Sequence, residues 1–508
     1  MALLEAAVNS GRIRGHYAWD QTVSVFKGIP FAAPPVGDLR WRAPQPVKPW
    51  EGVLDAAEYS QIPMQPRPVP GSFYEKEFYP LKLPRSEDSL YLNIWTPAAS
   101  AEEKLPVVLW IYGGGFTAGY ANKLEVDGEA FAKKGIVFVS CNYRLGIFGF
   151  LAHPELTAED LHHSSGNYGI LDQLAALRWI RENIAAFGGD PDCITLMGQS
   201  AGAMSVQILA ASPLTAGMAR RAIMESAGGC GGLMAHMTRS LSEAEEIGRQ
   251  ILAACGVSSL EEARKLPAEE LLEKSVDFMN NSILRDVFVP NYDGYLLPDS
   301  VFHITKNGGL AQLDYLLGST SNEASSYPKP SAYPGREAFL AEAAERYFDR
   351  KGSLLRILSA EGRNEPETIR HFKDNQMTYE MEASLAGWKK CFSDRGENAG
   401  YLYKWARDIP QHEPGGAFHS SEHMYLFRTM DRSWRHYTGA DYELSGTMCR
   451  FWTNFIRTGD PNGEGLPRWT KYSAEDPQTM VLNLTCGMQP YQESEAARFI
   501  ASRELKYL

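Results

Sequence analysis

A strand that runs directly into a sharp turn at Ser200 constrains this chain more than any other feature. Residues 194–197 form an apolar, strand-like run, and Gly198, Ser200 and Gly202 follow with the spacing G-x-S-x-G. Side chains in place of the two glycines would collide in so tight a strand-to-helix turn, which lifts the serine hydroxyl clear of the sheet. A five-residue pattern also arises by chance, so it indicates a nucleophile only if a base, an acid and an oxyanion hole accompany it.

The surrounding sequence predicts an α/β fold built on a mostly parallel sheet. Residues 107–112 and 136–141 are continuous apolar runs, which are typical of strands buried on both faces. Asp172–Phe187 has the apolar spacing of a helix and stops at a Gly-Gly-Asp-Pro turn. Further strands are expected at 222–225, 315–318 and 402–405, alternating with helices. Such alternation predicts a largely parallel sheet with helices on both faces.

Two charged stretches rich in Leu, Glu and Ala interrupt this alternation, at about residues 242–310 and 330–395. We expect them to be helical insertions that form caps over the site. No repeat or linker divides the chain, so residues 1–508 are predicted to be a single domain. The Pro-rich segment 61–84 has no regular period and is expected to wrap over the surface or over a site.

Composition excludes several classes of function. The net charge of −12 gives no electrostatic footprint for nucleic acid or an anionic membrane. The apolar runs are too short to span a bilayer, and residues 1–8 lack the apolar core of a signal peptide. Seven cysteines without a C-x-x-C pair indicate reduced thiols in a cytoplasmic protein. We expect no metal or organic cofactor, and the oligomeric state is left open between monomer and homodimer.

Three consecutive glycines, residues 113–115, follow the apolar strand at 107–112. Backbone N–H groups aimed at a developing oxyanion stabilise it, and loss of one donor costs about 3–4 kcal/mol. Gly114 and Gly115, with the amide of Ala201, could supply three such donors. The rival interpretation is a phosphate or dinucleotide loop, but the segment lacks both G-K-[ST] and the G-x-G-x-x-G spacing.

The base is expected to be a histidine late in the chain. His419 lies in a Gly-rich loop, residues 415–422, after the expected strand 402–405. A loop there can carry an imidazole over the carboxyl edge of the sheet. His412 and His423 are nearby competitors without comparable context.

The acid should lie between the serine and the histidine in chain order. Glu323 fits, because it follows the expected strand at 315–318 within a short polar loop. A buried carboxylate there would fix the tautomer of the imidazole and stabilise the imidazolium. Asp293 is the best rival, although it belongs to an insertion.

Together these segments resemble the type-B carboxylesterases, which include cholinesterases and bacterial para-nitrobenzyl esterases. The resemblance implies an α/β-hydrolase fold, a catalytic triad of Ser200, Glu323 and His419, and an oxyanion hole of Gly114, Gly115 and Ala201. It also implies that Ser226 supports the acid, although a packing role is equally consistent with the sequence. The likeness covers nearly the whole chain and is carried by residues 26–31, 86–94, 112–116, 142–146, 166–173, 198–203 and 459–463.

Departures from the family pattern sharpen the expectation. Gln199 stands beside the nucleophile where many relatives have glutamate. Ile62 or Pro63, and Ser89, occupy the places of a disulfide found in secreted members, and the same loop lacks the tryptophan with which cholinesterases bind choline. The glycine-rich residues 228–233 suggest a roomy or mobile acyl pocket.

The sequence thus predicts a serine carboxylesterase of broad range acting on a small-molecule ester through an acyl-enzyme. An amidase or a carbonate or lactone hydrolase would use the same triad. A remote alternative is a non-catalytic adhesion relative of the same fold.

Overall fold

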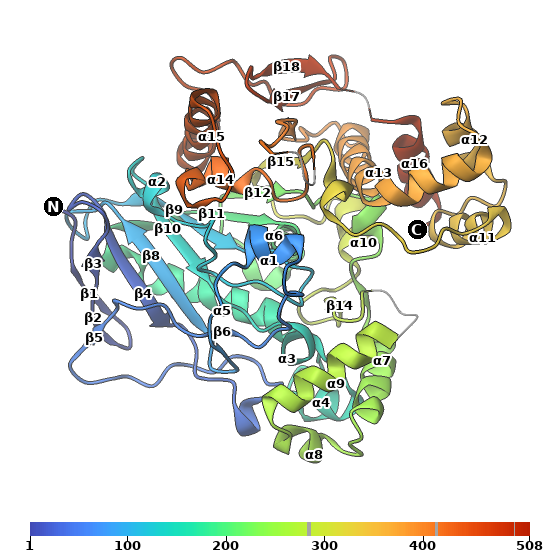
Figure 1. Cartoon of the computed structure of the whole chain (residues 1–508). Coiled ribbons are helices and arrows are strands. Elements are labelled where there is room, and N and C mark those ends of the chain that lie inside the picture. Colours follow the sequence, from blue (N-terminus) through green and yellow to red (C-terminus); the bar gives the residue numbers. More distant parts are fainter. Residues whose placement is uncertain (282–285, 412–414, 492) are drawn as a thin grey trace.

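The computed structural model describes residues 1–281, 286–411, 415–491 and 493–508. Its centre is a mixed sheet with eleven strands in the described part of the chain (Figure 1). In order across the sheet these are β18 (Gly487–Pro490), β17 (Gln478–Leu482), β16 (Tyr401–Trp405), β15 (Asp314–Thr320), β12 (Arg221–Glu225), β11 (Gly189–Gln199), β9 (Leu105–Ile111), β10 (Val137–Cys141), β8 (Tyr91–Thr96), β4 (Ser24–Pro30) and β3 (His16–Tyr17).

The strands from β10 to β17 are parallel, and those at the two edges pair antiparallel with their neighbours. Because carboxyl ends of parallel strands meet at one edge, the turns after β9, β11, β15 and β16 converge there. This edge carries the predicted site residues. The expected mostly parallel α/β sheet is confirmed.

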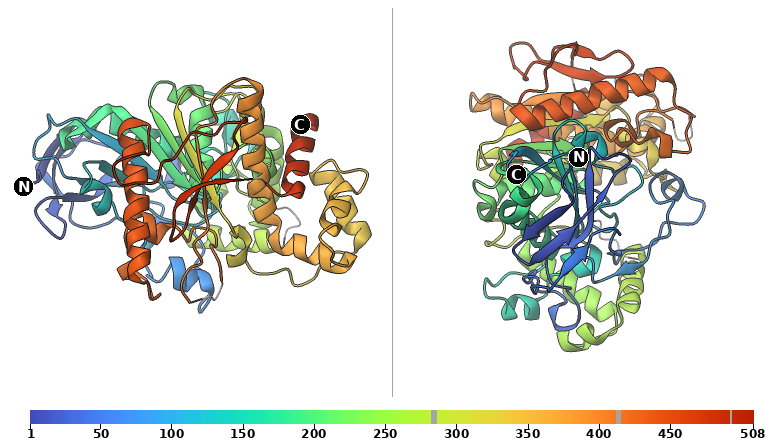
Figure 2. Two further views of the ribbon diagram at one scale, coloured as in Figure 1. Left: turned by 90° about the horizontal axis from the view of Figure 1, so that it is seen from above. Right: turned by 90° about the vertical axis from the view of Figure 1, so that its left-hand side faces the viewer.

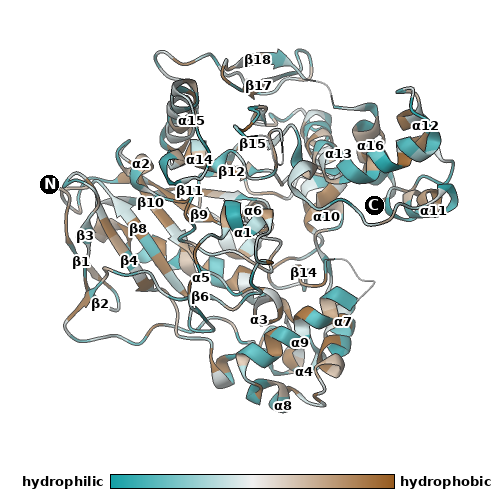
Figure 3. Ribbon diagram, in the orientation of Figure 1, coloured by the Kyte–Doolittle hydropathy of each residue, from teal (hydrophilic) through white to brown (hydrophobic). Residues whose placement is uncertain are grey.

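The sheet is apolar on both faces. In β9, Val107 and Leu109 pack into one hydrophobic core, whereas Val108 and Trp110 pack into a second core on the other face. This alternation is the physical reason for the continuous apolar runs in the sequence. In Figure 3 the central strands are accordingly mostly brown or pale, while the outer helices carry teal stretches.

Helices cover each face of the sheet. The first core includes residues of α5 and α6, and the second includes residues of α2, α14 and α15. The bounds of the helices named here are α2 (Glu129–Ala132), α5 (Tyr168–Asn183), α6 (Ala201–Ala211), α14 (His423–Leu426) and α15 (Gly439–Thr458).

The remaining elements surround this framework. Shorter helices are α1 (Phe73–Phe78), α3 (Gly146–Phe150), α4 (Pro154–Glu159) and α10 (Val301–Lys306). Small strands are β1 (Glu5–Val8), β2 (Gly11–Arg14), β5 (Val53–Asp55), β6 (Ile62–Pro63), β7 (Arg85–Ser86), β13 (Arg239–Ser240) and β14 (Asn291–Tyr292). Among the described helices none has both the length and the apolar character needed to cross a bilayer.

Both segments that interrupt the alternation are helical. The first holds α7 (Leu241–Ala254), α8 (Leu260–Lys265) and α9 (Ala268–Asn281), and the second holds α11 (Arg336–Arg346), α12 (Ser353–Ser359) and α13 (Glu365–Asp394). In Figures 1 and 2, α11 and α12 lie beside the C-terminal helix α16 (Glu495–Tyr507), at the end of the molecule opposite the N-terminal strands.

Two buried ion pairs explain family-like motifs that carry no catalytic chemistry. Arg144 donates to Asp172 through Nε at 2.8 Å and a terminal nitrogen at 2.7 Å. Arg40 binds Glu87 in the same two-pronged way, at 2.7 and 2.6 Å. Such bidentate pairs fix geometry, and removal of one partner would leave a buried charge.

Candidate active site

Ser200 occupies the turn between β11 and α6 in a backbone conformation that is uncommon for a residue with a side chain. Its φ is 56° and its ψ is −127°, and its N–H donates to the carbonyl of Glu225 at 2.8 Å. A Cβ at Gly202 would lie 2.0 Å from the carbonyl oxygen of Ile111, and one at Gly198 would lie 2.5 Å from the carbonyl of Gly202. Both glycines are therefore required by close packing of the backbone, as the sequence predicts.

His419 and Glu323 form a buried pair at the same edge of the sheet. His419 Nδ1 lies 2.6 Å from Glu323 Oε2, and the two residues are 5% and 0% exposed. The other carboxylate oxygen accepts the backbone N–H of Thr320 at 2.7 Å. Since a carboxylate only accepts, Nδ1 carries the proton and Nε2 presents its lone pair. This is the tautomer that a general base requires.

Gln199, rather than Ser200, makes the hydrogen bond to the free nitrogen of this imidazole. The Gln199 amide nitrogen lies 3.1 Å from His419 Nε2. Within the described residues, no hydrogen bond joins Ser200 Oγ to the ring of His419. The structure thus brings the three predicted residues to one edge, with the final serine–histidine contact unmade.

The rival acid has a different task. Asp293 accepts the backbone N–H groups of Tyr295, Leu296 and Leu297, and its second oxygen accepts from the side chain of Asn167 at 2.9 Å. These bonds close a turn in the insertion. Asp293 thus has a structural role, and among the described residues it forms no hydrogen bond or ion pair with a histidine.

The rival bases are not placed like His419. His423 is buried, neither of its ring nitrogens has a hydrogen-bond partner among the described residues, and burial lowers its pKa. Its Nδ1 is 4.0 Å from Glu125, a longer separation than the pair at His419. His412 lies outside the described residues.

The glycine run after β9 lies against the turn at Ser200. A Cβ at Gly113 would lie 2.8 Å from Ser200 Cβ, and one at Gly114 would lie 2.0 Å from the carbonyl oxygen of Ala118. Gly114 and Gly115 have φ values of 128° and 61°, so both adopt conformations that side chains disfavour. Ala201 is the first residue of α6. Only glycine lets this backbone approach the nucleophile so closely.

Ser226 has a partner that sequence reasoning missed. Its hydroxyl lies 3.4 Å from Glu422 Oε1, and the described hydrogen bonds include none from Ser226 to Glu323. Glu225, next to it, accepts from Trp452 Nε1 at 2.7 Å. The resemblance implied support of the acid, whereas Ser226 contacts a different buried carboxyl.

Glu225 and Glu422 are fully buried at this edge. Burial raises the pKa of Glu225 to about 8 and raises that of Glu422 well above its usual range, where the nearby Glu225 and Glu323 add to the effect. Glu225 is therefore mostly protonated near pH 7, and the neutral form of Glu422 is favoured in the same way. The sequence places Glu225 at a strand end but gives no sign of its burial.

Close packing, rather than an open space, accounts for the glycines after Ser226. A Cβ at Gly229 would lie 2.4 Å from the carbonyl oxygen of Ser384, and one at Gly232 would lie 2.0 Å from that of Glu380, both on α13. These glycines are therefore required by close packing against α13. The roomy or mobile acyl pocket stays a prediction.

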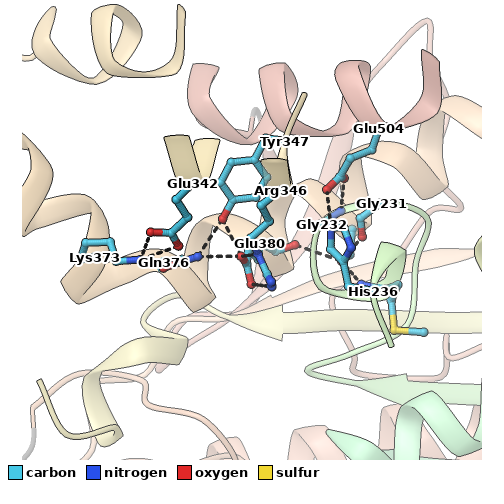
Figure 4. A network of polar contacts seen from close by, with 12 residues as sticks. Gly231, Gly232, His236, Glu342, Arg346, Tyr347, Lys373, Gln376, Glu380 and Glu504 are labelled. Atoms are coloured by element: carbon cyan, nitrogen blue, oxygen red, sulfur yellow. Dashed lines mark hydrogen bonds and ion pairs between the residues drawn. The ribbon is translucent and has the colours of Figure 1, made fainter. Parts of the chain in front are cut away.

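Polar contacts clamp the same loop between α13 and α16. Figure 4 shows Glu504 of α16 accepting the backbone N–H of Gly232, and Glu380 of α13 bound to Arg346 and to the hydroxyl of Tyr347. From α13, the hydroxyl of Ser384 donates to the carbonyl of Gly231 at 2.7 Å. The second insertion and the C-terminal helix thereby fix one wall beside the site.

The Pro-rich segment contributes an aromatic cover. It contains α1, whose Phe73 packs edge-on against Phe418 at 5.3 Å between ring centroids. Tyr74 of the same helix contacts Tyr327 at 5.9 Å, and Tyr327 lies 5.8 Å from His419. The segment was expected to lie over the surface or over a site, and these contacts favour a position that covers the site.

No disulfide closes this segment. Instead, two short strands pair at its ends, β6 and β7. Ile62 and Pro63 of β6 pair in parallel with Arg85 and Ser86 of β7. All seven cysteines, each within the described residues, are free thiols.

A hollow of about 630 Å³ lies elsewhere, between the segment 41–49 and α5. None of the three predicted catalytic residues lines it. This hollow is therefore separate from the predicted catalytic residues. Among the described residues no cluster of His, Cys, Asp or Glu is arranged to hold a metal ion.

A parallel sheet of this order, with a serine at a strained strand-to-helix turn and a buried His–Glu pair beside it, defines the α/β-hydrolase class. Comparison with known proteins agrees. The family model described as "Carboxylesterase family" matches residues 3–331 and 340–500. The chain belongs to the carboxylesterase family and is a carboxylic ester hydrolase.

Individual relatives span almost the whole chain. It is 32% identical to a para-nitrobenzyl esterase of Bacillus subtilis, over 96% of each protein. It is also 32% identical to a fumonisin B1 esterase of Sphingopyxis macrogoltabida, over 89% of this chain and 82% of that protein. A solved thermophilic PNB esterase matches with a TM-score of 0.81 and 29% identity, over 98% of this chain and 99% of that one. The predicted family and fold are confirmed.

Proposed function

We propose that Ser200 is the nucleophile, His419 the general base and Glu323 the acid that orients it. Ser200 Oγ attacks the ester carbonyl while its proton passes to His419 Nε2. Collapse of the tetrahedral intermediate expels the alcohol, which takes the proton from the imidazolium, and leaves an acyl-enzyme. Water, deprotonated by the same nitrogen, then releases the carboxylic acid and free Ser200.

The observation that carries this assignment is the buried hydrogen bond between His419 Nδ1 and Glu323 Oε2, 2.6 Å long. It fixes the tautomer in which Nε2 can accept a proton, at the sheet edge that also bears Ser200. Histidine is suited to this task because its charge changes near neutral pH.

The oxyanion hole is assigned to the backbone N–H groups of Gly114, Gly115 and Ala201. The approach of Gly113 to Ser200 Cβ supports this assignment, because donors must lie about 3 Å from the developing oxyanion. Preorganised backbone donors need no reorientation during the reaction.

Substrate range is proposed to be broad within small-molecule carboxylic esters, since relatives named for different esters span most of the chain. Amides, carbonates and lactones could be cleaved by the same triad. The non-catalytic adhesion alternative is disfavoured, because the serine and the buried His–Glu pair are all retained.

We further propose that residues 1–508 act as one domain in which the segments 242–310 and 330–395 shape access to the site. Support comes from α13, where Thr378 Oγ1 accepts the N–H of Ala324 beside the acid at 3.2 Å. A cytoplasmic location is proposed because the seven thiols are unpaired.

The test is hydrolysis of para-nitrophenyl acetate and butyrate by the wild type and Ser200→Ala. Loss of a triad member is expected to lower kcat by about 10⁴-fold or more. Wild-type turnover in the alanine variant would contradict the assignment.

A further inference from the structure

Gln199 occupies the hydrogen-bonding position that the nucleophile would need. Its amide nitrogen is 3.1 Å from His419 Nε2. Gln199 is 2% exposed and is the last residue of β11, immediately before Ser200. The strained turn therefore holds its side chain beside the ring.

The protonation pattern makes this contact a competition. Because Nδ1–H donates to Glu323, Nε2 offers a single lone pair, and only one strong donor can use it. The Gln199 amide and the Ser200 hydroxyl are both donors. While the amide holds the lone pair, Ser200 lacks its base.

We propose that Gln199 is a positioning residue that caps His419 Nε2 in the resting enzyme, so that activation of Ser200 requires this hydrogen bond to break. The inference rests on the proposed roles of Ser200 and His419. It means that Gln199 lowers the reactivity of the Ser200 nucleophile, in addition to any role in packing.

The residue type gives the proposal a specific consequence. A glutamine amide can donate to the neutral ring and, after turning over, accept from the imidazolium. A glutamate in its place can only accept, which favours the imidazolium and removes the cap from the neutral ring. Glutamine and glutamate should therefore give different pH profiles from the same fold.

Other ionisable groups near His419 do not differ between such variants. Glu323 faces it from the loop after β15, and Tyr327 packs against the ring. His423 lies within electrostatic range of His419, and Glu422 lies within range of Glu323 and Glu225. Because these residues are the same in every variant, a difference between the profiles is attributed to the side chain at position 199.

The experiment measures inactivation of the full chain by phenylmethylsulfonyl fluoride, as a second-order rate constant across pH. In this reaction Ser200 Oγ bonds to sulfur, the S–F bond breaks, fluoride leaves and the proton passes to His419. The rate therefore reports the nucleophile without depending on ester preference. The variants are Gln199→Met, which has similar length but no donor, and Gln199→Glu.

A released hydrogen bond of ordinary net strength should accelerate inactivation of Gln199→Met by about 2- to 10-fold. Gln199→Glu should move the acid limb of the profile to higher pH. The matched control is Gln173→Met. Gln173 is a fully buried glutamine of α5 that donates to Ser205 of α6, and its replacement should change neither quantity.

A rate for Gln199→Met equal to or below that of the wild type would overturn the proposal. If Gln199→Met does not fold, Gln199→Glu provides the test. A pH profile of its inactivation rate that superimposes on that of the wild type would then overturn the proposal. Complete resistance of the wild type to the reagent would instead refute the role of Ser200 itself.

Discussion

Replacing Glu323 by glutamine tests the orientation of the base with a nearly isosteric change. Glu323 Oε1 accepts the N–H of Thr320 at 2.7 Å, so the glutamine must place its carbonyl oxygen there. Its NH2 group then faces His419 Nδ1, where it can only donate. The imidazole must shift its proton to Nε2 and loses the lone pair that accepts the proton of Ser200.

The expected cost is large because the pair is fully buried and cannot be replaced by water. Inversion of the tautomer in a serine triad lowers kcat by about 10⁴-fold, or roughly 5.5 kcal/mol of transition-state stabilisation. The assay is the steady-state hydrolysis of para-nitrophenyl butyrate by Glu323→Gln, with urea unfolding to verify the fold.

Asp293→Asn is the matched control, because Asp293 is also a carboxylate that accepts backbone N–H groups. This control should lower stability and leave kcat within a few-fold of the wild type. A loss of kcat below 10-fold in Glu323→Gln, or an equal loss in the control, would refute the reasoning.

Three further predictions follow from the same contacts. Gly114→Ala should lower kcat/KM about 10²- to 10³-fold by displacing oxyanion donors, whereas Gly446→Ala, with no atom within 4 Å of the added Cβ, should leave esterase activity unchanged. Gly387→Ala should lower the free energy of unfolding by at least about 1–3 kcal/mol, because its Cβ would lie 1.5 Å from the carbonyl oxygen of Cys230. The control Gly446→Ala is also in a helix and should raise the free energy of unfolding by about 0.5–1 kcal/mol. Urea titrations measure both. Burial raises the pKa of Glu225 to about 8, so folding takes up a proton at any pH between its ordinary pKa and about 8. This group therefore lowers the free energy of unfolding increasingly as pH rises through that window. Glu225→Gln should flatten the decline in stability between pH 5 and 8, and an unchanged slope would contradict the burial of Glu225 as a neutral acid.

Strand ends made the site predictable. Ser200, Glu323 and His419 follow β11, β15 and β16, and the rule that parallel strands present their carboxyl ends at one edge brings them together. Apolar runs located these strands because a sheet buried on both faces needs side chains of one kind throughout. The edge strands β17 and β18 are short and mixed in character, so the sequence did not reveal them.

Contacts between distant segments could not be predicted. The bond from Gln199 to His419 joins residues 220 positions apart, and its direction depends on a tautomer set by a third residue. The burial of Glu225 and Glu422 likewise depends on packing against segments that are distant in the sequence, such as α15, whose Trp452 donates to Glu225. The glycines of residues 228–233 suggested a roomy or mobile acyl pocket. Their close packing against α13 could not be read from the sequence, because small residues occur both beside open space and in close packing.

The covalent intermediate provides the most direct test of the central claim that Ser200 is the acylated nucleophile. The protein is mixed with para-nitrophenyl acetate, quenched in acid within the first turnovers and digested for peptide mass spectrometry. We expect an acetyl group on Ser200 in the wild type and none on the corresponding peptide of Ser200→Ala. Acylation of another residue at the rate of turnover, or turnover of Ser200→Ala at the wild-type rate, would contradict the mechanism.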